Sequence, residues 1–97
     1  MSKRESVPKY PSQLDEMNAV DKIFNRTLKQ RNKIIKRNSK VDREKIRTLD
    51  LKMSMCIKKR AKLTKGGYND IPINMWEWKP HFSIDKKLLP KTTYVKV

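Results

Sequence analysis

The residues with the clearest chemical potential lie between Arg26 and Lys40, in the stretch RTLKQRNKIIKRNSK. Seven of these fifteen residues are Lys or Arg, and none is acidic. Guanidinium and ammonium groups repeated in this way bind phosphates or acidic protein surfaces through ionic attraction and charge-assisted hydrogen bonds. The stretch therefore predicts a polyanion-binding face, whose partner is either a nucleic acid phosphate backbone or an acidic protein surface.

A helical arrangement would sort this stretch into two sides. At about 100° per residue, Phe24, Leu28 and Ile35 share the apolar side, where we expect them to pack inward or on a partner. Six cations fall opposite, and we call them the basic stripe: Arg26, Lys29, Lys33, Lys36, Arg37 and Lys40. Arg31 falls on the apolar side, and we expect its aliphatic stem to carry the charge outwards to solvent.

The alternative interpretation of the basic stripe is an ordinary solvated helix face. Such faces usually mix Glu with Lys, because opposite charges four residues apart attract and like charges repel. Here no acid lies between Asp21 and Asp42. The unrelieved repulsion favours a face that meets a polyanion over one that meets only water.

Two helical segments must position these residues, so the fold class is mainly α. Apolar residues at three- and four-residue steps predict a first helix over about 13–37, with Ser12 as its N-cap. A second helix is predicted over about 40–64, with Ser39 as its N-cap and Gly66-Gly67 as its stop. The two segments form either a helical hairpin or one long helix, and we favour the hairpin.

The rest of the chain divides around this helical basic region, which spans 12–65. Residues 1–11 contain two prolines and no apolar period, which predicts an extended arm. Residues 66–97 predict an extended, aromatic-rich tail with one short helical turn, IDKKLL, capped by Ser83 and ended by Pro90. The last residues, TTYVKV, have the composition of a strand that could add to an available edge.

The tail carries a second candidate for partner contact in MWEWKP. In an extended chain Trp76 and Trp78 would face the same side. They could then anchor the tail in pockets of a protein partner or stack on bases. The alternative is that both rings cover the helices and supply core, as large aromatic residues usually do.

Composition narrows the classes of function. The formal net charge is +15, and residues 21–60 hold fifteen cations and four anions. This imbalance implies a polyanionic neighbour. Leu, Ile, Val and Phe number 22 of 97 residues, so we expect a marginal core that a partner helps to complete.

The sequence shows no combination of residue types that is typical of a catalytic site. The chain has one histidine, His81, and one cysteine, Cys56, which falls within the apolar period of the second helix. No spacing typical of metal ligands, a catalytic triad or a phosphate-cradling loop is present. We expect no enzyme activity, no cofactor and no metal. No apolar run is long enough for a bilayer span and no secretory signal is apparent, so we expect the virion, cytoplasm or nucleus as location.

These observations favour a non-enzymatic structural or accessory protein that threads onto a large nucleic-acid-containing assembly. The version we favour is a virion, with the chain as an auxiliary or internal capsid-associated protein. Two alternatives stay open: a small ribosomal-type RNA-binding protein, and a free DNA- or RNA-binding regulator. A membrane surface fits less well, because the apolar face of the first helix is modest and no tryptophan flanks it.

Overall fold

A computed structural model describes residues 8–37, 40 and 42–91 of the chain. It is 44 Å long and about as wide as it is deep, at 29 × 28 Å. The elements in chain order are the 3-10 turn η1 (Pro11–Gln13), α1 (Leu14–Arg37), α2 (Arg43–Leu63), the 3-10 turn η2 (Gly67–Asp70), the single turn α3 (Ile73–Trp76) and the 3-10 turn η3 (Lys86–Leu88).

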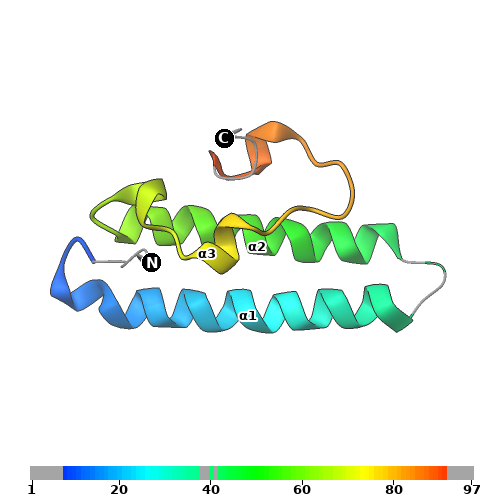
Figure 1. Ribbon diagram of the computed structural model, residues 1–97, viewed down its shortest axis with the longest axis horizontal. Coiled ribbons are helices and arrows are strands. Elements are labelled where there is room, and N and C mark those ends of the chain that lie inside the picture. Colours follow the sequence, from blue (N-terminus) through cyan, green and yellow to red (C-terminus); the bar gives the residue numbers. More distant parts are fainter. Residues whose placement is uncertain (1–7, 38–39, 41, 92–97) are drawn as a thin grey trace.

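The two long helices lie antiparallel and side by side, with the tail folded back over them (Figure 1). The structure therefore confirms the helical hairpin over the single long helix. The start of α2 is set by Asp42, whose side chain accepts a hydrogen bond from the backbone N–H of Lys45 at 3.1 Å. An N-cap of this kind satisfies one of the backbone donors that the first turn leaves free.

The predicted N-caps of both helices need correction. Ser12 lies inside η1, which leads directly into α1, so it does not cap the helix. Tyr10 precedes this turn without a side-chain capping bond, and Pro11 provides the fixed φ that suits a first helical position. Ser39 lies outside the described residues, and Asp42 caps α2, which begins three residues later than predicted.

An apolar core lies between the hairpin and the described part of the tail. The buried members come from α1, α2 and the residues after α2: Met17, Val20, Phe24, Met53, Cys56, Ile57, Ala61, Leu63, Ile71, Met75 and Trp78. Leu28, Tyr68, Trp76 and Leu89 pack against this cluster and are partly buried. Burial of apolar surface is the main favourable term in folding, so residues of the tail help to hold the hairpin together.

The described part of the tail returns along the hairpin. α2 ends at Leu63, and Gly67 takes the left-handed conformation, with φ +60°, that lets the chain reverse. The expected turn near 84–89 is η3, although its cap is Asp85 and not Ser83. Ser54 and Lys58 of α2 donate hydrogen bonds to the carbonyls of Leu88 and Lys87 at 2.8 and 3.1 Å.

Only the end of the predicted N-terminal arm is described, and the predicted strand TTYVKV lies outside the described residues. Pro8 forms an isolated antiparallel bridge with Thr64, next to the C-terminus of α2. The Lys9 N–H donates to the Leu63 carbonyl at 2.8 Å. These contacts place the start of the described chain beside the end of the hairpin.

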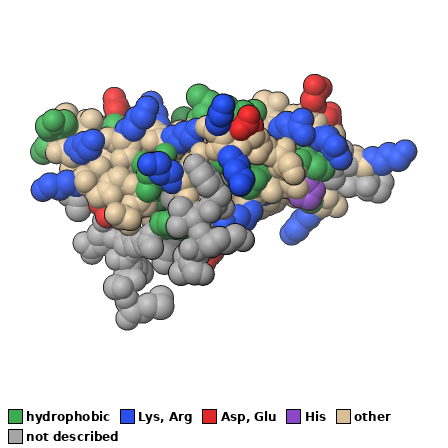
Figure 2. Space-filling model, turned by 90° about the horizontal axis from the view of Figure 1, so that it is seen from above, with side chains coloured by type: hydrophobic (Ala, Val, Ile, Leu, Met, Phe, Trp, Pro, Cys, Tyr) green, Lys and Arg blue, Asp and Glu red, His purple; other side chains and the backbone are tan. Residues whose placement is uncertain are grey.

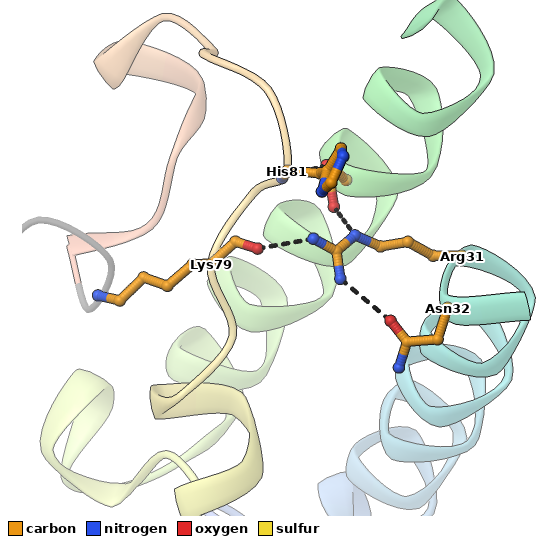
Figure 3. A network of polar contacts seen from close by, with 5 residues as sticks. Arg31, Asn32, Lys79 and His81 are labelled. Carbon is orange, nitrogen blue, oxygen red and sulfur yellow. Dashed lines mark hydrogen bonds and ion pairs between the residues drawn. The ribbon is translucent and has the colours of Figure 1, made fainter. Parts of the chain in front are cut away.

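A buried ion pair joins the two helices in the half nearer their connection. Arg31 Nε lies 2.6 Å from Asp50 Oδ1, and the exposed fractions of these side chains are 10% and 0%. Figure 3 shows Arg31 reaching from α1 towards the tail, where its guanidinium donates to the Lys79 carbonyl at 2.9 Å. The second Asp50 oxygen accepts the backbone N–H of His81 at 3.0 Å.

This pair corrects the expectation that Arg31 carries its charge outwards. Asp50 supplies an opposite charge on the facing side of α2, so the guanidinium is stabilised inside the molecule. Because both groups also bind the backbone of residues 79–81, the pair fixes the tail and α1 against α2 together.

A second pair joins the other end of the hairpin. Arg60 Nη1 lies 2.5 Å from Asp21 Oδ1 and also donates to the Met17 carbonyl at 3.3 Å. Burial raises the pKa of the Asp21 carboxyl above its usual value, and the Arg60 guanidinium opposes part of that rise. The two pairs together set the rotation of α1 about its own axis.

Candidate polyanion-binding face

The rotation of α1 decides where the basic stripe points. Arg31 turns inward to Asp50, and Phe24 is fully buried in the core. The opposite side of the helix must therefore face solvent, since helical neighbours are related by about 100° per residue. All six residues of the basic stripe are exposed. Five of them lie on α1, while Lys40 lies beyond its end, in the connection to α2.

Four stripe residues line a shallow hollow on α1. The hollow is lined by Arg26, Lys29, Lys33 and Lys36, together with the amides of Gln30 and Asn32. Every one of these side chains can donate hydrogen bonds, and none carries a negative charge. An anion with several acceptor oxygens, such as a phosphate group, matches this set of donors.

The described carboxylates do not neutralise the stripe. Asp21 and Asp50 pair with Arg60 and Arg31, while the side chain of Asp42 caps α2. No ion pair joins a stripe residue to a carboxylate within the described ranges. Figure 2 shows a different side of the molecule, the one that carries the tail, where Lys and Arg are also spread along the length among fewer Asp and Glu.

The predicted partner anchors lie mostly inside the chain's own fold. Phe24 is 0% exposed and Trp78 is 4% exposed, so neither ring is available on the surface. Leu28, Ile35 and Trp76 are partly buried, and two of them, Leu28 and Trp76, pack against the core. The tryptophans are not on one side of an extended strand, because Trp76 ends α3 and Trp78 follows it.

Sequence reasoning missed the residue that orients this face, Asp50. A signal was present, because Asp50 stands in the buried period of the second helix between Ile46 and Met53. Arg31 is likewise a single charge on the apolar side of α1. One isolated charge on each of two facing apolar stripes indicates an interhelical ion pair, since unpaired charges are seldom buried.

The remaining reactive side chains do not converge. Cys56 is buried between the helices, and burial raises the pKa of its thiol despite the nearby Lys52 and Lys59. A raised thiol pKa leaves little thiolate at neutral pH, and the thiolate is the nucleophilic form. His81 stacks edge-on against Phe82, with ring centroids 4.7 Å apart. In the described ranges, no three His, Cys, Asp or Glu side chains gather in a way that could hold a metal ion.

Comparison of the chain with models of protein families, with curated proteins and with solved structures gives no significant match. Among the described residues, no helix combines the length and the apolar character needed to cross a membrane.

Proposed function

We propose that the chain is a non-enzymatic basic protein that binds the phosphate backbone of nucleic acid through the basic stripe. It would serve as a structural accessory of a large nucleic-acid-containing assembly, of which a virion is the kind favoured by the sequence. The observation that carries the proposal is an acid-free, solvent-facing row of cations on a helix whose rotation two ion pairs fix.

A bound polyanion would offset the repulsion within such a row of cations. Like charges repel along the helix, and a repulsion of this kind lowers stability unless an anion offsets it. α1 has 24 residues and so extends about 36 Å at 1.5 Å per residue. A rigid rod of that length can meet several successive phosphates, and such contacts position a protein without reading the base sequence.

The proposal rests on the helix and not on a threading tail. Residues 66–91 pack on their own hairpin, where Ile71, Met75 and Trp78 belong to the core. The contact with the assembly is therefore assigned to α1, and the tail is assigned the task of supporting the hairpin. The raised pKa of the Cys56 thiol and the scattered carboxylates support a non-enzymatic role.

The test is fluorescence-anisotropy binding of the full chain to random duplex DNA and to structured RNA over a salt series. Six cations engaged on duplex phosphates predict a slope of log affinity against log salt near −5, from about −0.9 per contact. Changing all six stripe residues to Gln should abolish binding at moderate salt. The comparison of DNA with RNA identifies which nucleic acid the face prefers.

A matched variant controls for net charge alone. It changes six other exposed lysines to Gln: Lys52, Lys59, Lys62, Lys65, Lys86 and Lys91. This variant loses the same amount of charge and should keep most of the affinity and the slope. Equal losses in the two variants would contradict a defined face, and negligible binding of the unaltered chain would turn the search to an acidic protein surface.

A free nucleic-acid-binding regulator is the second candidate, and one observation favours it. The tail closes a core over the hairpin within the same chain, as a regulator that folds without an assembly would need. A regulator also needs sequence preference, which the stripe does not supply. Competition between duplexes of different sequence separates the two, because a stripe that contacts only phosphates binds them equally.

A further inference from the structure

A second surface, mostly separate from the basic stripe, lies along the seam of α1 and α2, where two of its residues, Val20 and Cys56, also belong to the core. We call it the Met55 groove. Its apolar lining consists of Val20 and Ile23 from α1 and of Met55 and Cys56 from α2. Its charged lining consists of Lys52, Lys58, Lys59 and Lys62. No Asp or Glu is among the residues that line it.

The groove holds exposed apolar side chains that the fold does not explain. Ile23 is 40% exposed and Met55 is 69% exposed, on two helices whose other large apolar residues, apart from Leu14, are buried or partly buried. A neighbouring pair of large exposed apolar residues indicates a contact site more than a lone one does. Methionine is suited to such a site, because its unbranched, polarizable side chain adapts to different partners.

The apolar strip continues along the seam towards the helix connection. A second hollow is lined by Gln30, Lys33, Ile34 and Arg37 from α1 and by Lys45 and Leu49 from α2. Ile23, Gln30 and Ile34 follow one line of α1 by their spacing, as Leu49, Lys52 and Cys56 do on α2. From residue 23 to residue 37 this line is about 21 Å long, at 1.5 Å per residue.

The lining chemistry specifies what could fill the seam. The apolar atoms at the centre of the groove would pack against an apolar ridge on the partner. The surrounding lysines would pair with negatively charged groups on both sides of that ridge. A bare phosphate backbone has the charge but lacks the apolar ridge. The apolar atoms lie in a hollow between lysines. A flat lipid surface would contact them less well than a ridge that inserts into the hollow.

We propose that the Met55 groove binds an acidic amphipathic helix of a partner protein, which packs along the seam as a third helix. Two antiparallel helices present a groove into which a third helix fits, as in helical bundles. The described ranges contain no strand, so they offer no sheet edge for an extended peptide. The fitting helix has about four turns, with apolar residues at three- and four-residue steps flanked by Asp or Glu.

The first experiment selects partners without assuming their sequence. The full chain is used as bait for a displayed library of random peptides about 16 residues long, enough for roughly four turns of helix. We expect the enriched peptides to be acidic and to repeat apolar residues at helical spacing. Enrichment of peptides without that pattern, or no enrichment over an unrelated basic protein, would overturn the proposal.

Variants at exposed positions then locate the site. The probe is the most enriched peptide, labelled with fluorescein and measured by anisotropy. Met55→Glu and Ile23→Glu should each weaken its binding about tenfold or more, the loss of an interface anchor. Met55→Leu should bind like the unaltered chain. Leu14→Glu is the matched control, because Leu14 is 49% exposed on α1 and lies outside the groove.

Two further outcomes separate this proposal from others. Met55→Glu should leave the salt slope of DNA binding unchanged, so a failure of the groove and a failure of the basic stripe are distinguishable. Vesicles of phosphatidylserine are the second probe. Binding to vesicles that Met55→Glu abolishes, with no loss for the peptide, would assign the surface to lipid and overturn the proposal.

Discussion

At the scale of single residues, the molecule depends on charges that it buries. Arg31 and Asp50 hold each other inside the hairpin and also bind the backbone of residues 79–81. A buried pair of this kind contributes little over two apolar residues of similar size, because both charges must leave water. It is nevertheless costly to break, because the remaining charge is left without a partner.

We expect Asp50→Ala to destabilise the fold severely, by about 3–5 kcal/mol, since it strands the Arg31 guanidinium and removes the acceptor of the His81 N–H. The double variant Arg31→Met with Asp50→Leu should recover most of that loss. Urea unfolding followed by far-UV circular dichroism measures both. Glu77→Gln, at an exposed acid, is the control, and a double variant as unstable as Asp50→Ala would contradict this account.

At the scale of elements, the hairpin depends on how its second helix begins. Asp42 accepts the Lys45 N–H, directly after the connection that reverses the chain. Asp42→Ala should lower the free energy of unfolding by about 1 kcal/mol, the usual effect of losing an N-cap. Asp42→Asn should be close to the unaltered chain, since Asn caps as well as Asp. If urea unfolding shows that Asp42→Asn and Asp42→Ala lower the free energy of unfolding by the same amount, the effect comes from the lost charge of Asp42 and not from its capping hydrogen bond.

The local signals of the sequence were sufficient for the helices but not for their ends. Apolar periodicity predicted both helical segments, because it reflects which side each helix buries. The predicted N-caps, Ser12 and Ser39, are wrong. Serine, threonine, aspartate and asparagine cap helices about equally well, so tertiary contacts decide which of them stands at the start of a helix. At α2 the residue that caps the helix is Asp42, three residues after Ser39.

The candidate site was predictable in part. Five cations of the basic stripe follow from helical geometry, because they lie on α1, and the structure shows them exposed. Lys40 is also exposed, but it lies beyond the end of the helix, where that geometry does not apply. The inward turn of Arg31 was not predictable from one helix, because it depends on Asp50 in the other. The core position of Trp78 and the exposure of Met55 depend likewise on how the tail and the two helices meet.

At the scale of the whole molecule, net charge opposes folding. The formal charge of +15 on 97 residues makes the compact state repel itself. Raising salt from about 0.01 M to about 0.1 M shortens the screening length from roughly 30 Å to roughly 10 Å. We expect the thermal midpoint of the full chain to rise over that range, and a gain of about 1 kcal/mol corresponds to roughly 4–8 °C.

The variant with all six stripe residues changed to Gln separates this effect from others. At low salt its thermal midpoint should be higher than that of the unaltered chain, and added salt should raise it less, because much of the charge repulsion has been removed. Circular dichroism melting of both proteins in the same buffers gives the comparison. A midpoint of the unaltered chain that falls with added salt would mean that the ion pairs outweigh the repulsion.

The inward position of Arg31 has a consequence for how this gene can change over time. Removing one residue between Phe24 and Arg31 would turn the rest of α1 by about 100°, taking Arg31 away from Asp50 and moving Lys33, Lys36 and Arg37 off the solvent side. Exchanging Lys for Arg within the stripe would disturb neither. Descendants of this sequence should therefore vary in which basic residue stands at each stripe position, while the length of α1 stays the same.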